Sequence, residues 1–219
     1  MRLPDETNRL AIVGATGSGK TQAALWHLSV RDIDRRPWII YNFKRDKSID
    51  KIPFSQNLEL DEIPLKPGIF VVHPTPSQQD EVEKQMWEVW AKTGIGIYVD
   101  EGYMIDRNND AFGTLLTQGR SLECPMIVLS QRPVWMNRFV FSESDFVQVF
   151  RLQHKNDRKT VSEFVPVPKD WIETGTLPKY HSLYYDVGDN KLTPLTPVPD
   201  IEKIHDNFAR RLRHIRKTV

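Results

Sequence analysis

An eight-residue glycine-rich segment constrains this chain more than any other feature of its sequence. The segment GATGSGKT, residues 14–21, has every fixed position of the pattern G-x-x-x-x-G-K-[ST]. An apolar run at residues 10–13 precedes it, and residues 21–28 have helical composition. Glycines let the turn between a strand and a helix wrap closely around a phosphate, so that backbone N–H groups and the helix N-terminus face the anion. The pattern predicts a nucleotide site in an α/β fold.

The chemistry of phosphoryl transfer suggests a role for each part of this segment. Lys20 is expected to place a positive charge at the β- and γ-phosphates of ATP, and the Thr21 hydroxyl is expected to bind Mg²⁺. The residues predicted to bind the nucleotide are Gly14, Ala15, Thr16, Gly17, Ser18, Gly19, Lys20 and Thr21.

Two adjacent acids follow a second apolar segment. Residues 95–99 have strand composition and lead directly into Asp100 and Glu101. The carboxyl ends of parallel strands meet at one edge of a sheet, so these acids are expected beside the phosphate-binding turn. Asp100 is predicted to hold Mg²⁺ through water, and Glu101 to polarise the water that attacks the γ-phosphate.

A polar residue ends the next predicted strand along the chain. Residues 126–129 are apolar, and Gln131 follows them in the sequence LSQRP, residues 129–133. An amide at this strand end can contact both the γ-phosphate and the attacking water. The order of phosphate-binding turn, acid pair and glutamine therefore assigns Gln131 a role in sensing hydrolysis.

Short apolar runs alternate with segments of helical composition through residue 165. Strands are predicted at residues 38–43, 69–72, 95–99, 126–129 and 146–152, and helices after Ser77, which with Asp80 resembles a capping box, and at residues 110–122. This alternation predicts a mostly parallel sheet with helices on both faces. Residues 1–165 are interpreted as the core. Residues 166–219 are interpreted as an extension packed on it, with a hairpin at 180–190, a proline-rich spacer and a final helix.

Composition excludes several classes of protein. Apolar residues make up 39% and charged residues 27% of the 219 residues, which is typical of a globular protein and not of a disordered chain. No apolar stretch approaches 18 residues, so no membrane span is expected. Cys124 is the single cysteine, which excludes an internal disulfide and favours a reducing setting. Residues 201–219 hold six Lys or Arg against two acids, which indicates an anionic partner at this end or a solvated helix terminus.

Taken together, the motifs resemble the HerA–FtsK superfamily of P-loop ATPases. The matching segments are GATGSGKT at 14–21, IYVDE at 97–101, GRSLECPMIVLSQRP at 119–133 and FRLQHKNDRKTV at 150–161. They span about residues 10–165, and the last two are more discriminating than the first two. The resemblance implies a RecA-like core, assembly into a homo-oligomeric ring, and ATP-driven pumping of double-stranded DNA.

The resemblance also implies an arginine finger that reaches the γ-phosphate bound by a neighbouring subunit. Arg158 is the first candidate, Lys159 occupies the adjacent position, and Arg120 of the Gly-Arg pair is a second candidate. Loops that grip DNA phosphates without reading sequence are expected where basic or polar residues interrupt the core. The candidates for these contacts are Lys44, Arg45, Lys47, Lys51, Arg107 and Asn108.

A bare core of this size is similar to the genome-packaging ATPases of membrane-containing icosahedral DNA viruses. That resemblance implies packaging into a preformed capsid, a capsid-vertex or portal protein as partner, and a place in the host cytoplasm or the virion. Three alternatives stay open: a cellular or plasmid DNA pump, a small P-loop kinase, and a non-enzymatic assembly or secretion adaptor similar to Zot-like phage proteins. A kinase fits less well, because Asp100-Glu101 and Gln131 do not belong to its design.

Overall fold

A single sheet runs through the computed structural model, which describes residues 2–213 of the chain. Its strand order is β3-β4-β2-β5-β6-β1-β7-β8-β9. The pairs from β3 to β7 are parallel, whereas β7-β8 and β8-β9 are antiparallel. The mostly parallel sheet predicted from the sequence is confirmed. The strands are β1 Arg9–Val13, β2 Pro37–Asn42, β3 Gln56–Asn57, β4 Gly68–Val72, β5 Gly96–Asp100, β6 Met126–Ser130, β7 Phe146–Val149, β8 Ser182–Asp186 and β9 Lys191–Leu195.

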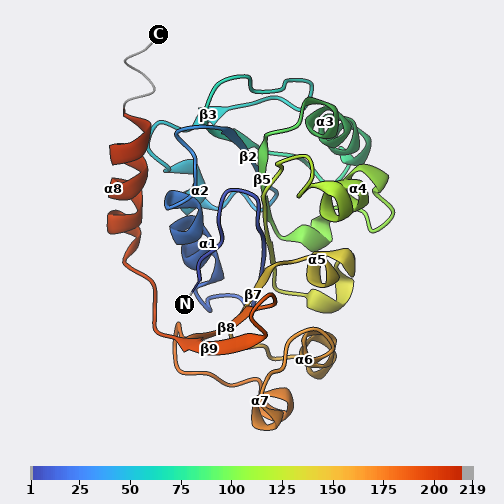
Figure 1. Cartoon of the computed structure of the whole chain (residues 1–219), viewed down its shortest axis with the longest axis vertical. Helices are drawn as coiled ribbons and strands as arrows, with labels where there is room; N and C mark the ends of the chain where they lie inside the picture. The colour runs from blue at the N-terminus through green and yellow to red at the C-terminus, as the bar shows by residue number, and fades with distance from the viewer. Residues whose placement is uncertain (1, 214–219) are drawn as a thin grey trace.

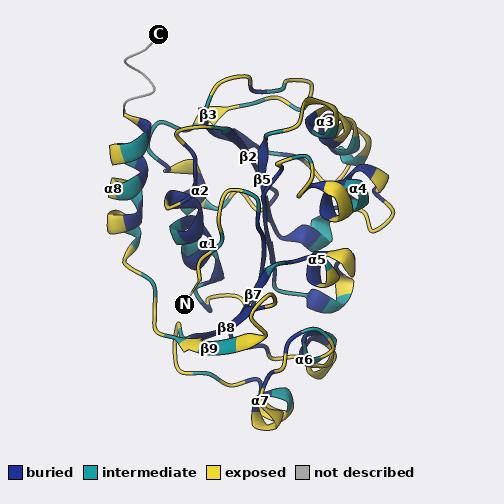
Figure 2. Ribbon diagram, viewed as in Figure 1, coloured by how far each residue is buried: buried dark blue, intermediate teal, exposed yellow. Residues whose placement is uncertain are grey.

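Helices cover both faces of the sheet (Figure 1). One face carries α1 (Lys20–Ser29), α2 (Lys47–Asp50) and α8 (Ile201–Leu212), and the other carries α3 (Gln79–Lys92), α4 (Asp110–Gln118) and α5 (Phe139–Ser142). Side chains alternate between the faces along each strand, so two separate cores form. Along β5, for example, Tyr98 packs in the core with α1, whereas its neighbours Ile97 and Val99 pack in the core with α3 and α4. The central strands are buried throughout, whereas exposed residues lie on outer helix faces, in loops and on the edge strands β3 and β9 (Figure 2).

The segment after residue 165 continues the same sheet. The β8–β9 hairpin extends it beyond β7, and α8 crosses back to pack on α1 through Ile204, Phe208 and Leu212. Ile215, the last member of the apolar stripe expected in this helix, lies outside the described residues. Two short helices, α6 (Lys155–Ser162) and α7 (Lys169–Thr174), lie beside the hairpin at the lower end of the view (Figure 1).

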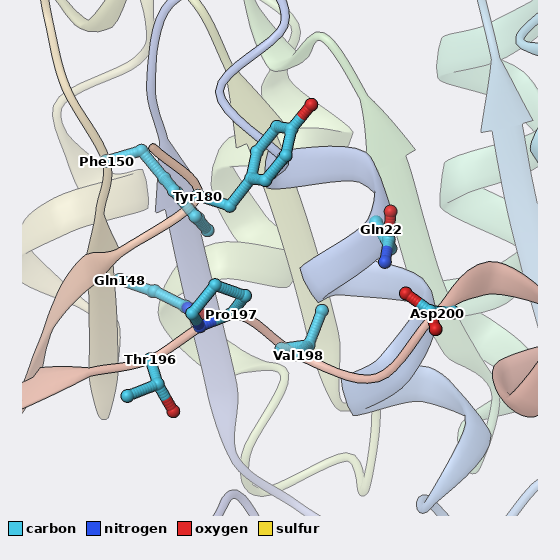
Figure 3. Close-up of a pocket in the computed structure, with 9 residues that line it drawn as sticks. Gln22, Gln148, Phe150, Tyr180, Thr196, Pro197, Val198 and Asp200 are labelled. Carbon is cyan, nitrogen blue, oxygen red and sulfur yellow. The ribbon is translucent and has the colours of Figure 1, made fainter. Parts of the chain in front are cut away.

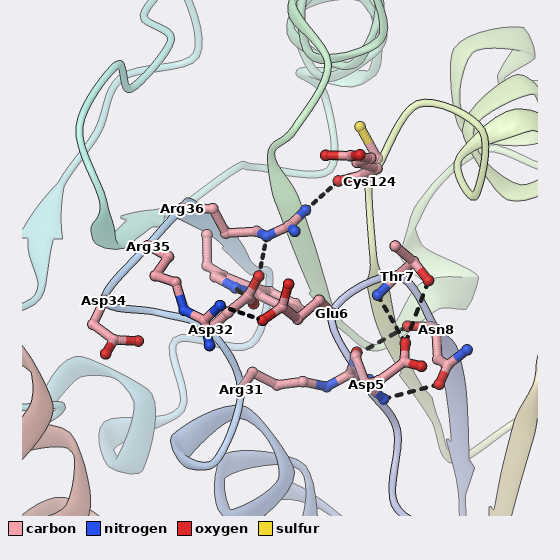
Figure 4. Close-up of polar contacts among 12 residues, drawn as sticks. Asp5, Glu6, Thr7, Asn8, Arg31, Asp32, Asp34, Arg35, Arg36 and Cys124 are labelled. Carbon is pink, nitrogen blue, oxygen red and sulfur yellow. Dashed lines mark hydrogen bonds and ion pairs between the residues drawn. The ribbon is translucent and has the colours of Figure 1, made fainter.

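A polar network joins the segments that precede several strands, at the sheet edge where the strands begin (Figure 4). Arg36, just before β2, pairs with Asp32 and donates to the backbone carbonyl of Glu123, just before β6. Arg31 donates to the carbonyl of Asn8, just before β1, at 3.2 Å. Burial lowers the pKa of Arg31 to about 10 from its usual 12.5. These contacts satisfy backbone carbonyls at the sheet edge where the strands begin. The glycine-rich loop lies at the opposite edge, where the strands end.

Several element boundaries differ from the sequence-based predictions, and three of the differences have a visible structural reason. The helix expected to begin at Ser77 has Gln78 as its N-cap and no side-chain cap, because the Gln78 amide oxygen accepts from Thr75 N at 3.0 Å instead. The helix expected to reach residue 122 ends at Gln118, and the Cys124 N–H donates to the Gly119 carbonyl in the turn that follows. The strand expected over residues 146–152 ends at Val149, since the next residues turn toward the glycine-rich loop.

Candidate active site

Three neighbouring strands deliver the predicted site residues to one edge of the sheet. The glycine-rich loop follows β1, Asp100 ends β5, and Gln131 follows β6, which lies between them. The registers match, since Val13 pairs with Ser130, and Asn42 at the end of β2 pairs with Asp100. The edge therefore brings the loop, the acid pair and the glutamine together, as the order of the motifs suggested.

The backbone of the glycine-rich loop is held tightly at its start. Gly14 N donates to the Ser130 carbonyl at 3.1 Å, and Ala15 N donates to the Arg151 carbonyl at 2.9 Å. A Cβ on Gly14 would lie 2.6 Å from the Cβ of Phe150, so only glycine fits there. Gly17 and Gly19 have φ angles of +70° and +98°, which side chains disfavour. The loop therefore requires glycine at three of its positions.

Helix α1 begins directly after this loop with its N-terminal N–H groups uncapped. Its N-cap Gly19 makes no side-chain cap, and its first turn contains no acid. The Ser18 hydroxyl is buried and has no hydrogen-bond partner within the described residues. Lys20, the first helical residue, is only 6% exposed. Unpaired donors, a positive helix end and a buried lysine together form a site that fits a phosphate chain.

Glu101 is almost completely buried, and both of its carboxylate oxygens are occupied. Oε1 lies 2.5 Å from Lys44 Nζ and 3.4 Å from Lys20 Nζ, while Oε2 accepts from Gln131 N at 3.0 Å. Its backbone is left-handed, with φ of 65°, which is uncommon for a residue other than glycine. A backbone strained in this way positions the carboxylate inside the site and away from solvent.

Asp100 lies in the opposite electrostatic situation. Burial, followed by the neighbouring charges of Glu101 and Asp46, raises the pKa of Asp100 to about 7 from its usual 3.8. Its negative charge is therefore undercompensated in the chain alone. A carboxylate and the Thr21 hydroxyl are the hard oxygen donors that Mg²⁺ prefers, and a bound cation would lower the pKa of Asp100 again. The donor set at this edge fits Mg²⁺.

The side chain of Gln131 bridges the glycine-rich loop and the segment after β5. Its Oε1 accepts from the Thr16 hydroxyl, and its Nε2 donates to the Tyr103 hydroxyl at 3.1 Å. The Tyr103 ring meets Trp135 edge-on at 5.8 Å between centroids. Both ends of the amide are thus held, so its oxygen and nitrogen have defined directions between the glycine-rich loop and the segment after β5.

A cavity of about 160 Å³ opens on the other side of the glycine-rich loop (Figure 3). Gly19 and Gln22 form its inner wall, and Phe150 and Tyr180 supply aromatic surfaces. The link from β9 to α8 closes it, where the Gln22 amide donates to the Pro199 carbonyl at 2.8 Å. The remaining lining residues are Gln148, Thr196, Pro197, Val198 and Asp200. Aromatic and proline side chains together with polar ones line this cavity, and such a lining suits a planar heterocycle next to a phosphate chain.

Arg158 occupies a different environment from the one that the resemblance implied. Only 6% of it is exposed, and its guanidinium donates to four backbone carbonyls of its own chain. The acceptors are the carbonyls of Leu152, Gln153, Ile172 and Glu173. The side chain thus ties the end of β7 to α7, so its guanidinium is held by its own chain in this structure, and its assignment as a finger stays a prediction.

The other basic candidates have side chains on the surface. Arg120 is 67% exposed and lies 3.9 Å from Asp145, and Lys159 is also exposed. Arg45, Lys47 and Lys51 are exposed, as is Asn108. Arg107 donates to the carbonyls of Val134 and Trp135, and Lys44 is committed to Glu101. The structure thus separates freely exposed cations from those already held by the chain.

Three features of the site were absent from the sequence analysis. They are the Lys44–Glu101 ion pair, the Tyr103–Gln131 hydrogen bond and the cavity between Phe150 and the link to α8. Lys44 and Tyr103 lie two and three residues beyond the ends of β2 and β5, and their nearness to strand ends was the available signal. The cavity gave no signal, since its walls come from segments far apart in the sequence, from Gly19 to Asp200.

The fold and this edge of the sheet define a P-loop nucleoside triphosphatase class of protein. No family model matches the chain. It is 47% identical over 215 residues to the DNA packaging ATPase P9 of Enterobacteria phage PRD1, and the match covers 95% of each protein. The chain therefore belongs to the family of viral DNA packaging ATPases that includes P9. The resemblance drawn from the motifs is confirmed.

Solved structures share the same fold. The genome packaging NTPase B204 of Sulfolobus turreted icosahedral virus 2, in complex with AMPPCP, matches with a TM-score of 0.69 and 18% identity over 90% of this chain and 100% of that one. ATPases 2 and 3 of EccC from Thermomonospora curvata match with a TM-score of 0.58 and 12% identity over 95% of this chain and 42% of that one. These identities establish similarity of fold alone.

Proposed function

We propose that this chain hydrolyses ATP and uses the energy to move double-stranded DNA into a preformed viral capsid. The observation that carries the proposal is the meeting of the glycine-rich loop, the Asp100–Glu101 pair and Gln131 at one sheet edge. The relative P9, which is named a DNA packaging ATPase, supports packaging over a kinase or a secretion adaptor.

The nucleotide is proposed to lie along the glycine-rich loop. Its phosphates accept from the N–H groups of residues 14–21 and pair with Lys20, and its base enters the cavity between Phe150 and Tyr180. Thr21 and Asp100 are the residues proposed to hold Mg²⁺, which neutralises phosphate charge as the γ-phosphoryl group leaves. The structurally similar B204 protein, whose structures were solved in complex with ATP-γS and AMPPCP, supports nucleotide binding by this fold.

Glu101 is proposed to orient and polarise the attacking water, and Gln131 to contact both that water and the γ-phosphate. Once the phosphates draw Lys20 away, one of the ammonium groups next to Glu101 Oε1 leaves. The amide of Gln131 is held by hydrogen bonds to Thr16 and Tyr103. Loss of the γ-phosphate is therefore proposed to change these two hydrogen bonds. This arrangement supplies the water-positioning that phosphoryl transfer to water requires.

The active unit is proposed to be a homo-oligomeric ring that encircles DNA. Arg120 and Lys159 are the exposed candidates for a finger that reaches the site of the next subunit. Arg45, Lys47, Lys51 and Asn108 are the exposed candidates for contacts with DNA phosphates. A capsid-vertex or portal protein is the proposed docking partner, in the host cytoplasm and on the virion. No helix among residues 2–213 is long and apolar enough to cross a membrane.

Steady-state ATP turnover with and without linear double-stranded DNA tests this proposal, with Glu101→Gln as the matched inactive variant. The expected result is turnover that rises with DNA, weakens as salt rises and falls about 100-fold or more in Glu101→Gln. Turnover that ignores DNA at every salt concentration would contradict the DNA-moving function. Turnover that survives Glu101→Gln would contradict the assignment of the site.

A further inference from the structure

The Lys44–Glu101 ion pair joins the proposed hydrolytic centre to a basic surface loop. Lys44 lies two residues beyond the end of β2, and β2 pairs with β5, so the ammonium reaches Glu101 directly at 2.5 Å. The Glu101 side chain is 1% exposed, whereas that of Lys44 is 38% exposed. The pair thus has one member inside the site and one member accessible to a partner.

This contact restricts what Glu101 can do. A carboxylate activates a water by accepting a hydrogen bond from it, and a neighbouring cation occupies part of its acceptor capacity. Lys20 also contacts Oε1, at 3.4 Å. It belongs to the glycine-rich loop, however, and is proposed to pair with the phosphates when the nucleotide binds. Lys44 lies outside that loop, so nucleotide binding alone leaves it paired with Glu101.

The turn that carries Lys44 is firmly built. Asp46 N donates to the Asn42 side-chain oxygen at 2.8 Å, and the Asn42 amide donates to Asp50 at 2.9 Å. Arg45 closes the turn with a φ of 53°. The exposed cations Arg45, Lys47 and Lys51 surround Lys44 along the chain. A rigid turn rich in cations, with one ammonium directed into the site, offers an anionic polymer a way to compete with Glu101 for Lys44.

We infer that Lys44 is a positioning residue that restrains Glu101 until a DNA phosphate takes its ammonium group. Pairing of Lys44 with the phosphate frees Oε1 to accept from the attacking water, so hydrolysis starts when DNA lies against this turn. No covalent bond changes, because one ion pair replaces another. The inference rests on the proposed function, since DNA is its competing anion.

The test is ATP turnover by full-length Lys44→Met, measured with and without linear double-stranded DNA. The expected result is a several-fold higher rate without DNA, a ratio of DNA-stimulated to basal rate close to one, and loss of the added rate in Lys44→Met/Glu101→Gln. Lys44→Arg is expected to restore a low basal rate, because its guanidinium also pairs with a carboxylate. The exposed Lys66, before β4 at the opposite sheet edge, supplies the matched control Lys66→Met, with both rates unchanged.

Two outcomes would overturn the inference. A basal rate that falls in Lys44→Met would place Lys44 on the nucleotide, as a direct helper of phosphoryl transfer. An unchanged basal rate, with the thermal unfolding midpoint of the parent chain, would show that the ion pair does not restrain Glu101. The basal rate needs no DNA, so it tests the restraint even if DNA fails to stimulate the parent chain, a failure that would count against the proposed function instead.

Discussion

Two adjacent carboxylates at the end of β5 are prepared for different tasks by their surroundings. Glu101 has cations at one oxygen and a backbone N–H at the other, so its charge is compensated. At Asp100, burial and the charges of Glu101 and Asp46 outweigh the opposing effect of the lysines and raise its pKa to about 7. The difference matches the proposed roles, since one acid orients water and the other needs a cation to complete its environment.

The raised pKa of Asp100 predicts a pH-dependent stability of the chain without Mg²⁺. A carboxyl group with a raised pKa in the folded state favours folding below its unfolded value of 3.8, and that contribution is lost as pH rises toward 7. Asp100→Asn removes the charge. We expect its free energy of unfolding to exceed that of the parent chain increasingly between pH 4 and pH 8, by up to about 4 kcal/mol.

Urea denaturation at several pH values, with and without Mg²⁺, measures this difference. Because Asp100 is proposed to hold Mg²⁺ in its charged form, addition of Mg²⁺ at pH 8 should narrow the difference in free energy of unfolding between the two proteins. A difference that stays constant from pH 4 to pH 8 would show that the Asp100 charge costs nothing in the folded chain.

The Tyr103 hydroxyl is expected to set the orientation of Gln131. Tyr103→Phe removes the oxygen that accepts from Gln131 Nε2 at 3.1 Å and keeps the ring against Trp135. Because the amide then loses one of its two fixed contacts, we expect kcat for ATP to fall roughly 3- to 10-fold with little change in KM. Steady-state kinetics at saturating ATP separates the two parameters. A change confined to KM would place Tyr103 in nucleotide binding instead.

Among the elements, the apolar strands were the most predictable from sequence. β2 and β5 are short buried runs bounded by polar residues, and their predicted ranges differ from the observed ones by about one residue. In contrast, α6 and α7 were not predicted. Helix α6 is mostly polar and lacks an apolar period, and its position depends on buried contacts of Asp157 and Arg158 with distant segments. Local composition contains no record of such tertiary contacts.

Arg158 is expected to contribute to stability, because it holds two elements together. Arg158→Ala leaves four carbonyl groups without their donor, and we expect it to lower the free energy of unfolding by about 2–4 kcal/mol. The adjacent Lys159 is exposed, so Lys159→Ala is a matched control with an expected change within about 0.5 kcal/mol. Chemical denaturation measures both. An Arg158→Ala protein with unchanged stability but no ATP turnover would instead support Arg158 as the arginine finger of a neighbouring site.

At the scale of the whole molecule, part of the site was predictable and part was not. The glycine-rich loop is a continuous motif, and parallel strands must bring Asp100 and Gln131 to the same edge as that loop. The pairing of Lys44 with Glu101, and the cavity closed by the link to α8, depend on how loops from different strands fold over this edge. Strand order and loop packing, rather than any motif, determine those contacts.

The proposed hydrolytic residues and the cavity lie on different sides of the glycine-rich loop. The acids, Lys44 and Gln131 lie toward β5 and β6, whereas the cavity lies toward β7 and the link between β9 and α8. Helix α8, with Arg210 and Arg211 in its last turn, continues directly from a wall of that cavity. The cavity therefore borders the N-terminal end of α8, whereas Arg210 and Arg211 lie at its C-terminal end.

ATP hydrolysis is proposed to move this protein along double-stranded DNA. The most direct test is displacement of a third DNA strand from a triplex. A labelled oligonucleotide bound as a triplex on linear DNA is released when a motor passes, and its release is followed by fluorescence. We expect release that requires ATP, fails with ATP-γS and is absent in Glu101→Gln. ATP turnover stimulated by DNA, without release above the Glu101→Gln level, would contradict translocation.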